Sequence, residues 1–483
     1  MTASQAILQG LAKDGGLFMP DRIPGLDISW EKLSSMTYQE TAYEVMKLFL
    51  TDYTEEELKG CINKAYDAKF DTEEIAPLTK AGGAYYLELF HGNTIAFKDM
   101  ALSILPHLMT TAARKNQADK EIVILTATSG DTGKAAMAGF ADVPGTRMIV
   151  YCPKGGGSRI QELQMRTQKG ENTAVVAIHG NFDDAQTGVK QIFGDQAFQE
   201  EMAGKGFQFS SANSINVGRL VPLVVYYVYA YARLLAHGEI GDGEEINVVV
   251  PTGNFGNILA AYFAKMMGTP IHKLICASND NKVLYDFFTT GIYDRNREFI
   301  LTSSPSMDIL ISSNLERLIY LSAGCSPEKN WKLMEELKET GRYAVTPQMK
   351  EKMGDFWGGF ADQEENGAEI KRVFADTGYL MDTHTGVASA VYQKYVRETG
   401  DRLKAVIAST ASPYKFAPSV MEAITGKKSE QEPFVLIDEM SALSKVPVPK
   451  AVDEIRSAPI RHSRECDVEG MKAEVKEILS FAN

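Results

Sequence analysis

Cysteine is scarce in this chain of 483 residues, and its thiols lie far apart in the sequence. The five are Cys61, Cys152, Cys276, Cys325 and Cys466. Their number is odd, and no two have the C-x-x-C spacing of zinc sites and redox motifs. The pattern indicates neither a disulfide framework nor a metal site, and it predicts a protein of the reducing cytoplasm.

Long apolar runs and an excess of positive charge are also missing. No uninterrupted apolar stretch approaches the ~20 residues of a membrane span, and residues 1–5 lack the basic and apolar parts of a signal peptide. We therefore expect no membrane insertion. The 63 acidic and 50 basic side chains give a net charge of −13, which would repel a nucleic-acid backbone. Any anionic ligand must be held by local basic groups.

What the sequence does contain is an alternation of short β-branched segments with helical ones after about residue 80. Such an alternation predicts an α/β fold with parallel strands and crossover helices. The expected strands are residues 122–126, 148–152, 175–178, 246–251, 274–277 and 405–409. With 44% apolar content, the chain is long enough for two or three domains.

The expected domains are a helical region at 1–80, an α/β region at 81–420 and an appendage at 421–483. Helical periodicity marks 38–50 and 54–70, with Asp52 and Thr54 as candidate caps. Within the α/β region, residues from about 100 to 230 are expected to form a smaller lobe. The acidic segment 361–367 is predicted to be an exposed loop, and the appendage has no function that its sequence indicates.

Two motifs point to chemistry. Lys98 lies in His91-Gly-Asn-Thr-Ile-Ala-Phe-Lys98-Asp99, between an apolar segment and an amphipathic one. By itself it would be a solvated lysine at a helix start. A second motif, Gly253-Asn254-Phe255-Gly256-Asn257, follows a buried-type strand and begins a helix, where free backbone N–H groups can bind an anion. An imine-forming lysine with a phosphate cradle predicts a pyridoxal phosphate site.

The spacing of the glycine loop differs from G-x-G-x-x-G, which weakens a dinucleotide-binding interpretation. A tight strand-to-helix turn that binds nothing is the other alternative.

Further motifs occur in one order along the chain, and with them it resembles the threonine synthases, pyridoxal-phosphate enzymes of the tryptophan-synthase-β type of fold. The likeness extends to about Phe416. The motifs are Gly10-Leu-Ala-Lys-Asp14-Gly15-Gly16, Thr128-Ser129-Gly130-Asp131-Thr132-Gly133, Gly180-Asn181-Phe182-Asp183, Ser211-Ala-Asn213-Ser-Ile-Asn216, Ser306-Met-Asp308 and Ser409-Thr410-Ala-Ser-Pro-Tyr-Lys415-Phe416.

The resemblance implies a fold-type II enzyme with two parallel-type α/β lobes and the cofactor between them. It implies that the Thr410 hydroxyl meets the cofactor's ring nitrogen and that Lys98 moves protons at the substrate Cα. It also implies that Ser129, Gly130, Asp131 and Thr132 bind the substrate α-carboxylate. The implied reaction converts O-phospho-L-homoserine and water to L-threonine and phosphate, in a monomer or homodimer.

A phosphorylated substrate needs cationic side chains, and the candidates are Lys154, Arg159, Arg219 and Lys415. Sequence reasoning does not choose among them. A second group of polar residues is expected either to line the far end of the cleft or to lie on helix surfaces. It consists of Asn213, Asn216, Ser306, Asp308, Asn314 and Arg317.

Several alternatives stay open at this point. Asp99 is preferred as a helix cap, and Asp131 or Thr132 is a possible cap of the next helix. His384 is preferred as a cap or a packed side chain rather than a catalytic group. Another pyridoxal-phosphate lyase that releases a keto acid, or a non-catalytic ligand-binding relative, would carry similar motifs.

Three residues differ from those that are common at the same positions in the family. Asn93 stands where proline is common, and Ser412 and Tyr414 replace a histidine and a small residue. They would affect the turn before Lys98 and the phosphate end of the pocket.

Overall fold

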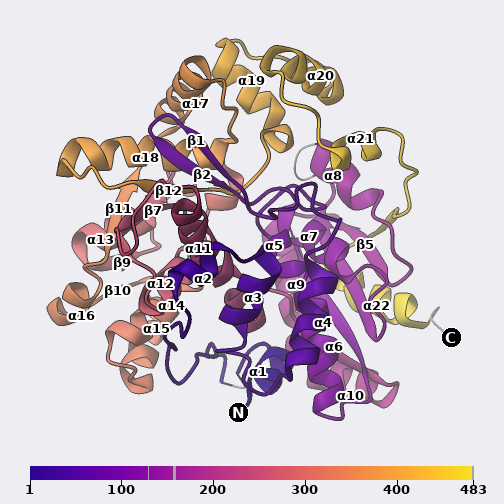
Figure 1. Ribbon diagram of the computed structural model, residues 1–483. Helices are drawn as coiled ribbons and strands as arrows, with labels where there is room; N and C mark the ends of the chain where they lie inside the picture. The colour runs from indigo at the N-terminus through magenta and orange to yellow at the C-terminus, as the bar shows by residue number, and fades with distance from the viewer. Residues whose placement is uncertain (13, 129, 156–158, 481–483) are drawn as a thin grey trace.

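The protein folds around two mainly parallel β-sheets, as the computed structural model describes for residues 1–12, 14–128, 130–155 and 159–480 (Figure 1). The larger sheet is parallel apart from an antiparallel hairpin of its first two strands. Its order is β1 (Leu78–Ala81), β2 (Ala84–Glu88), β12 (Ala405–Ser409), β7 (Ile246–Pro251), β8 (Ile271–Ser278) and β11 (Phe356–Phe360).

The smaller sheet is parallel throughout its described strands. Its order is β13 (Arg464–Cys466), β5 (Thr173–Ile178), β4 (Thr146–Pro153), β3 (Glu121–Ala127) and β6 (Phe207–Ser210). The predicted α/β class with parallel sheets is therefore confirmed, and each of the six predicted strands lies within an observed one.

Sequence reasoning missed the shorter strands, among them β6, β11, β13 and the separate antiparallel pair β9 (Ile292–Asp294) and β10 (Arg342–Ala344). In β11 the reason is composition, since Gly358 and Gly359 depress β propensity. A side chain at Gly359 would overlap its surroundings, because a Cβ there would lie 2.6 Å from the Val391 side chain.

The N-terminal region is helical, with α1 (Ala3–Gln9), α2 (Trp30–Ser34), α3 (Tyr38–Met46) and α4 (Glu55–Ala65). Thr54 caps α4 in a reciprocal capping box with Glu57, as predicted. The prediction for Asp52 is wrong. Its carboxylate accepts the Ser4 N–H at 3.2 Å and holds the start of α1 instead.

The lobes are completed by helices on both sides of the sheets (Figure 1). They are α5 (Asp99–Leu102), α6 (Leu105–Lys115), α7 (Asp131–Phe140), α8 (Arg159–Arg166), α9 (Phe182–Gly194), α10 (Gln196–Gly204), α11 (Val217–Ala236), α12 (Gly256–Met266), α13 (Val283–Thr290), η1 (Pro305–Met307), α14 (Leu315–Ser322), α15 (Pro327–Thr340), α16 (Pro347–Lys352), α17 (Gln363–Thr377), α18 (Thr383–Thr399), η2 (Pro413–Phe416), α19 (Ala417–Thr425), α20 (Pro433–Ser444), α21 (Lys450–Arg456), η3 (Val468–Gly470) and α22 (Met471–Ser480).

Helix α11 runs through the core. Among the described residues it is the one helix whose length and apolarity match a membrane span, and 83% of that window is buried. Arg219 and Arg233 interrupt its apolar sequence. Since it packs against α2, α3, α5 and α12, its apolar surface is covered by protein.

The exposed loop predicted at 361–367 is wrong. Ala361 is fully buried, and α17 begins at Gln363 with a capping box between Asp362 and Glu365. The acidic residues belong to a first helical turn, where they favour the helix dipole.

The C-terminal segment returns to the smaller lobe, as the yellow chain shows in Figure 1. After α19 to α21, β13 adds a parallel strand to β5 and α22 packs against α9. The Tyr151 hydroxyl on β4 donates to the Met471 carbonyl at 2.9 Å. The appendage of unknown purpose is thus a structural part of the smaller sheet.

Candidate active site

Lys98 is positioned by a loop that lies along the carboxyl end of β12. The Phe97 N–H donates to the Thr410 carbonyl at 2.8 Å, and the Ser412 N–H donates to the Ile95 carbonyl at 3.0 Å. These bonds bring Lys98 and Thr410, far apart in the sequence, to the same edge of the larger sheet. Ligands of open α/β sheets bind at such strand ends.

The Lys98 side chain is 14% exposed, and its Nζ lies 3.8 Å from the Asp131 Oδ2. Burial lowers the pKa of Lys98 to about 8, against the opposing effect of the Asp131 charge. The Lys415 ammonium and the Arg219 guanidinium lower it further. Burial therefore increases the fraction of neutral amine, the form that imine formation requires.

Asp131 is the centre of a buried polar cluster. Its carboxylate accepts hydrogen bonds from Lys415 Nζ at 2.9 Å, Gln161 Nε2 at 3.1 Å and Ser306 Oγ at 3.4 Å. Burial alone would raise the pKa of this carboxyl, but the Lys415 and Lys98 ammoniums hold it well below its usual range. Asp131 is ionised at neutral pH and balances two lysines.

Lys415 joins the two lobes at this cluster. It lies in η2, beyond β12 of the larger sheet, and its side chain is fully buried. Besides Asp131 on α7 of the smaller lobe, its ammonium donates to the Thr94 carbonyl at 2.9 Å.

Asp99 is not the helix cap that the sequence favoured. Residue 98 takes the cap position of α5, and the Asp99 carboxylate accepts from the Thr94 N–H at 2.8 Å and from its hydroxyl at 2.6 Å. Asp99 therefore holds the turn that leads into Lys98. Burial raises its pKa above the usual value.

The loop after β7 is shaped for a close ligand. Gly253 lies against the backbone of η1, where a Cβ would be 2.5 Å from the Ser306 carbonyl oxygen. Phe255 is buried with a left-handed φ of 63°, and α12 begins at Gly256. Within the described chain, the N–H groups of Gly256, Asn257 and Ile258 have no acceptor, so this helix start can bind an anion.

The asparagines of this loop have different partners. The Asn254 carbonyl accepts both the backbone and side-chain N–H groups of Asn314, each at 3.0 Å. The Asn257 Oδ1 accepts the hydroxyls of Tyr226 and Tyr227, each at 2.5 Å. The buried Asn257 Nδ2 has no partner in the described residues, and such an orphaned donor fits a bound phosphate oxygen.

Thr410 is 6% exposed, and its hydroxyl makes no hydrogen bond to the residues that the structure describes. Together with the buried Lys98 and the free N–H groups of α12, it provides a donor set that fits pyridoxal phosphate.

The loop before α7 leads directly into a helix, and its binding of the substrate α-carboxylate stays a prediction. Ser129 lies outside the described residues. Gly130 takes the cap position of α7 and its N–H donates to the Thr128 hydroxyl at 3.0 Å. Asp131 and Thr132 belong to the first turn of α7, so the cap interpretation is wrong for both.

The four candidate cations divide into two groups. Lys154 and Arg159 are at the surface, paired with Glu465 at 2.6 Å and with Glu162 at 2.9 Å. Arg219 is buried beside the cluster and donates to the Ala212 carbonyl at 2.8 Å, while burial lowers its pKa to about 10. Lys415 and Arg219 are therefore the cations close to Lys98.

Most of the remaining polar candidates stabilise loops. Asn216 caps α11 through the Gly218 N–H, and Asp308 accepts from Thr302 and two asparagine side chains. The Asn213 side chain accepts the Thr126 hydroxyl at 3.5 Å. Arg317 is fully buried and bonded to backbone carbonyls.

His384 is buried at the start of α18, in keeping with a packed side chain. Its Nδ1 lies 2.6 Å from the Asp382 carboxylate, and its Nε2 accepts the Ser306 N–H at 3.1 Å. This pattern assigns the proton to Nδ1. His384 thereby orients η1, and with it the hydroxyl that reaches Asp131.

Ser412 and Tyr414, which differ from the residues common in the family, each make a hydrogen bond. The Ser412 hydroxyl accepts the Tyr414 N–H at 3.4 Å, and the Tyr414 hydroxyl donates to the Val446 carbonyl. Tyr414 thus holds the start of the C-terminal segment. Sequence reasoning missed Gln161 and Thr94, because each acts through a partner far away in the chain.

Comparisons with known proteins bear on the whole chain. A family model described as pyridoxal-phosphate dependent enzyme matches residues 73–411. Models described as threonine synthase N terminus and threonine synthase, C-terminal match residues 1–66 and 385–463. Threonine synthase of Saccharomyces cerevisiae is 36% identical, over 91% of this chain and 90% of that protein. The chain belongs to the threonine synthase family.

Solved structures of the family agree with this fold. The yeast threonine synthase structure superposes with a TM-score of 0.89 at 32% identity, covering 100% of this chain and 96% of that one. The PLP-bound threonine synthase of Brucella melitensis gives 0.87 at 31% identity, covering 99% and 97%. The predicted family, fold type and pyridoxal phosphate cofactor are confirmed.

A second group of relatives has a longer chain. Threonine synthase-like 1 of Homo sapiens is 40% identical over 88% of this chain, and the match spans 58% of that relative. The chain thus spans less than two thirds of the length of these curated relatives.

Proposed function

We propose that the protein is a threonine synthase, which converts O-phospho-L-homoserine and water to L-threonine and phosphate. Family membership supports the reaction class. The observation that carries the proposal is the pairing of a buried, low-pKa Lys98 with a helix start whose N–H groups are free.

Pyridoxal phosphate, when bound, supplies an aldehyde for the amine and an electron sink for carbanions. Lys98 would hold it covalently, Gly253 to Asn257 its phosphate and Thr410 its ring nitrogen. A neutral hydroxyl at that nitrogen does not keep it protonated, which suits elimination chemistry better than transamination.

The side chains around Lys98 have separate tasks. The Lys98 amine takes the proton from the substrate Cα and returns protons later in the reaction. Asp131 and Thr94 keep the Lys415 ammonium in the cleft, where it can bind the anionic substrate. Burial of the cluster excludes water, which strengthens each of these interactions.

The test is to incubate cofactor-loaded protein with O-phospho-L-homoserine and to measure threonine and phosphate. Equal amounts of both are expected. Release of 2-oxobutyrate and ammonia would instead assign a keto-acid-forming lyase, and no turnover would contradict catalysis on this substrate.

Covalent cofactor attachment is tested separately with Lys98→Ala, using the exposed Lys329→Met as a matched control. We expect the borohydride-reducible absorbance to disappear in the first variant and to persist in the second. A reducible imine in Lys98→Ala would place the attachment on another lysine.

The cytoplasmic location, the monomer or homodimer and the domain boundaries near residues 80 and 420 stay predictions. The free cysteines of the described chain support a reducing compartment.

A further inference from the structure

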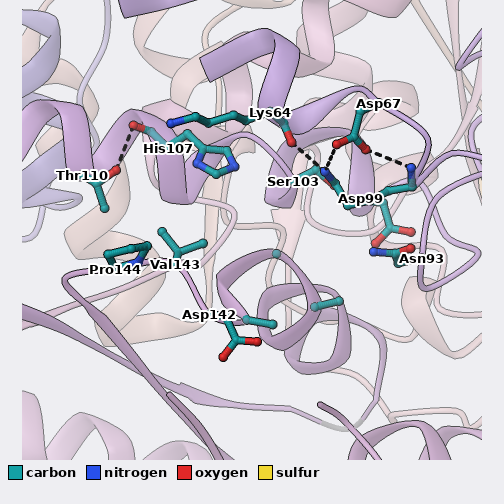
Figure 2. Close-up of a pocket in the computed structure, with 14 residues that line it drawn as sticks. Lys64, Asp67, Asn93, Asp99, Ser103, His107, Thr110, Asp142, Val143 and Pro144 are labelled. Atoms are coloured by element: carbon teal, nitrogen blue, oxygen red, sulfur yellow. Dashed lines mark hydrogen bonds and ion pairs between the residues drawn. The ribbon is translucent and has the colours of Figure 1, made fainter. Parts of the chain in front are cut away.

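A cavity of about 590 Å³ lies between the N-terminal helices and the smaller lobe (Figure 2). One wall is the end of α4 with the turn that follows it, a second is α5 with α6, and a third is the end of α7 with the loop before β4. Asp99, the residue after Lys98, is among the lining residues. The cavity therefore borders the helix that begins at the cofactor lysine.

The acidic groups of the cavity already have partners. Asp67 pairs with Lys69 at 2.7 Å, and Asp99 accepts both donors of Thr94. Asp142 accepts the backbone N–H of Glu171 at 2.8 Å. Little acceptor capacity is left for a cationic ligand.

The hydrogen-bond donors, in contrast, are available. In the described part of the chain, no hydrogen bond or ion pair is made by the ammonium of Lys64, the hydroxyl of Ser103 or the ring nitrogens of His107. The cavity is also lined by the amide of Asn93, which stands where proline is common in the family. An ammonium, a hydroxyl, an amide and an imidazole together match the oxygens of an anion.

The charged groups around the cavity are of both signs, with the ammonium groups of Lys64 and Lys69 on one wall. Burial lowers the pKa of His107 to about 4, and the charges of Lys64 and Lys69 lower it further, with Asp67 opposing them. Asp99 and Asp142 face the cavity from the other walls. An anion would therefore bind beside the Lys64 ammonium, a cation of this cavity that has no acidic partner in the described chain.

The wall formed by the end of α7 and the loop before β4 is mostly apolar, with Ala138, Ala141, Val143 and Pro144 beside Asp142. It provides contact for a carbon skeleton beside the polar groups, as small-molecule sites usually do. The volume is within the range of about 300 to 1,000 Å³ for such sites.

We propose that this cavity binds a small organic anion and that the bound anion modulates the reactivity of Lys98. The bound anion would affect Lys98 through the direct packing of α5 against α7. Helices α5 and α7 touch so closely that a Cβ at Gly139 would lie 2.0 Å from the Leu102 carbonyl oxygen. Lys98 immediately precedes α5 and Asp131 is the first residue of α7, so a ligand that shifts one helix changes the distance between these two charges.

Binding is tested on the cofactor-loaded full chain by following the imidazole resonances of His107, assigned with His107→Gln. Glycerol 3-phosphate and succinate are the probes, and the tighter one identifies the head group. A saturable shift by either probe is expected, with an affinity that rises as the pH falls because an anion favours protonated His107. No shift by either probe would overturn the proposal.

Lys64→Met should weaken this binding about tenfold by removing a charge-assisted hydrogen bond, while Lys329→Met on α15 leaves it unchanged. An equal affinity in Lys64→Met and wild type would contradict the site.

Coupling is read from the kcat and KM of the proposed reaction. The tighter probe should change them in wild type and not in Lys64→Met, whose basal rate stays unchanged. Equal effects in both proteins would place the action of the probe at the active cleft and contradict coupling. The binding readout does not depend on turnover, so failure of the proposed function would be seen separately.

Discussion

At the residue scale, two buried lysines have very different surroundings. Lys98 faces Asp131, so burial lowers the pKa of Lys98 while the opposite charge raises it. Lys134, one turn further along α7, is 9% exposed and bonded to the Gln168 side chain. Burial lowers its pKa to about 7, and the Lys415 charge adds to the effect. At both lysines the effect of desolvation on the pKa therefore exceeds that of the neighbouring charges. The net lowering is larger at Lys134, whose partner is neutral.

The pKa of Lys98 predicts a pH dependence for cofactor binding. Reconstitution of the cofactor-free protein should accelerate as the pH rises, with a midpoint at about 8, because the neutral amine reacts. In Asp131→Asn the midpoint should fall, since the carboxylate favours the ammonium. Stopped-flow absorbance measures the rate, and the exposed Asp376→Asn is the control. An unchanged midpoint in Asp131→Asn would contradict the assigned electrostatics.

Lys134 predicts a pH dependence of stability. Its folded pKa is below the unfolded value, so from about pH 7 upward the unfolded chain binds a proton that the folded chain has released. Stability of wild type relative to Lys134→Met should therefore rise with pH by up to about 1.4 kcal/mol per unit. The variant should be the more stable protein near neutral pH.

The measurement is urea unfolding of both proteins at several pH values between neutral and mildly alkaline. Lys329→Met should parallel wild type. A constant difference between Lys134→Met and wild type across this range would show that Lys134 stays charged in the fold.

At the scale of secondary-structure elements, the loop Gly253 to Asn257 is expected to bind the cofactor phosphate through its backbone rather than through charged side chains. It carries no charged residue from Gly253 to Asn257. Its anion-binding capacity comes from the strand end, the left-handed Phe255 and the start of α12. The sequence predicted these features because a buried strand, a glycine loop and an apolar helix follow one another directly.

Gly253→Ala should weaken cofactor binding at least tenfold, because its Cβ would overlap the Ser306 carbonyl oxygen and shift the loop. Gly367→Ala within α17 is the matched control, where nothing lies within 4 Å of the added Cβ. That change should raise stability by about 0.5 to 1 kcal/mol. Equilibrium titration with the cofactor gives the affinity, and wild-type affinity in Gly253→Ala would contradict the close contact.

The elements that sequence analysis missed share a cause. Strand β13 has three residues and no periodicity that distinguishes it from a loop. Strand β11 contains two adjacent glycines. Such elements exist because a neighbouring strand offers free backbone groups, and this information is not local.

At the scale of the whole molecule, the C-terminal segment connects the two lobes. It leaves the larger lobe at α19, and its β13 and α22 cover the edge and one face of the smaller sheet (Figure 1). Ion pairs of Lys476 with Glu201 at 2.7 Å and of Arg464 with Glu474 at 3.0 Å lie along this segment. The first pair is exposed and the second is half-buried, so they add little stability, and backbone pairing and apolar burial hold the segment.

Removal of residues 464–483 should destabilise the smaller lobe selectively. The edge of β5 would be unpaired and the apolar residues beneath α22 would be exposed, which also favours aggregation. Hydrogen exchange should accelerate in peptides of β4 and β5 and stay slow in β7 and β12. Tyr151→Phe, which removes one hydrogen bond to the segment, should give a small effect of the same kind. Equal acceleration in both sheets would show that the lobes unfold together.

The sequence by itself determined the groups whose signals are local: Lys98 in its motif, the loop Gly253 to Asn257, Thr410 at a strand end and six of the strands. Each depends on neighbours within a few residues, so periodicity and motif reveal it. Tertiary structure alone decided that Asp131, rather than a helix cap, is the counter-ion of Lys98 and Lys415. It also decided that Lys154 and Arg159 lie at the surface and that the tail completes a sheet. The contacts of Lys415 with Asp131, of Lys154 with Glu465 and of β13 with β5 join segments hundreds of residues apart, which no local pattern encodes.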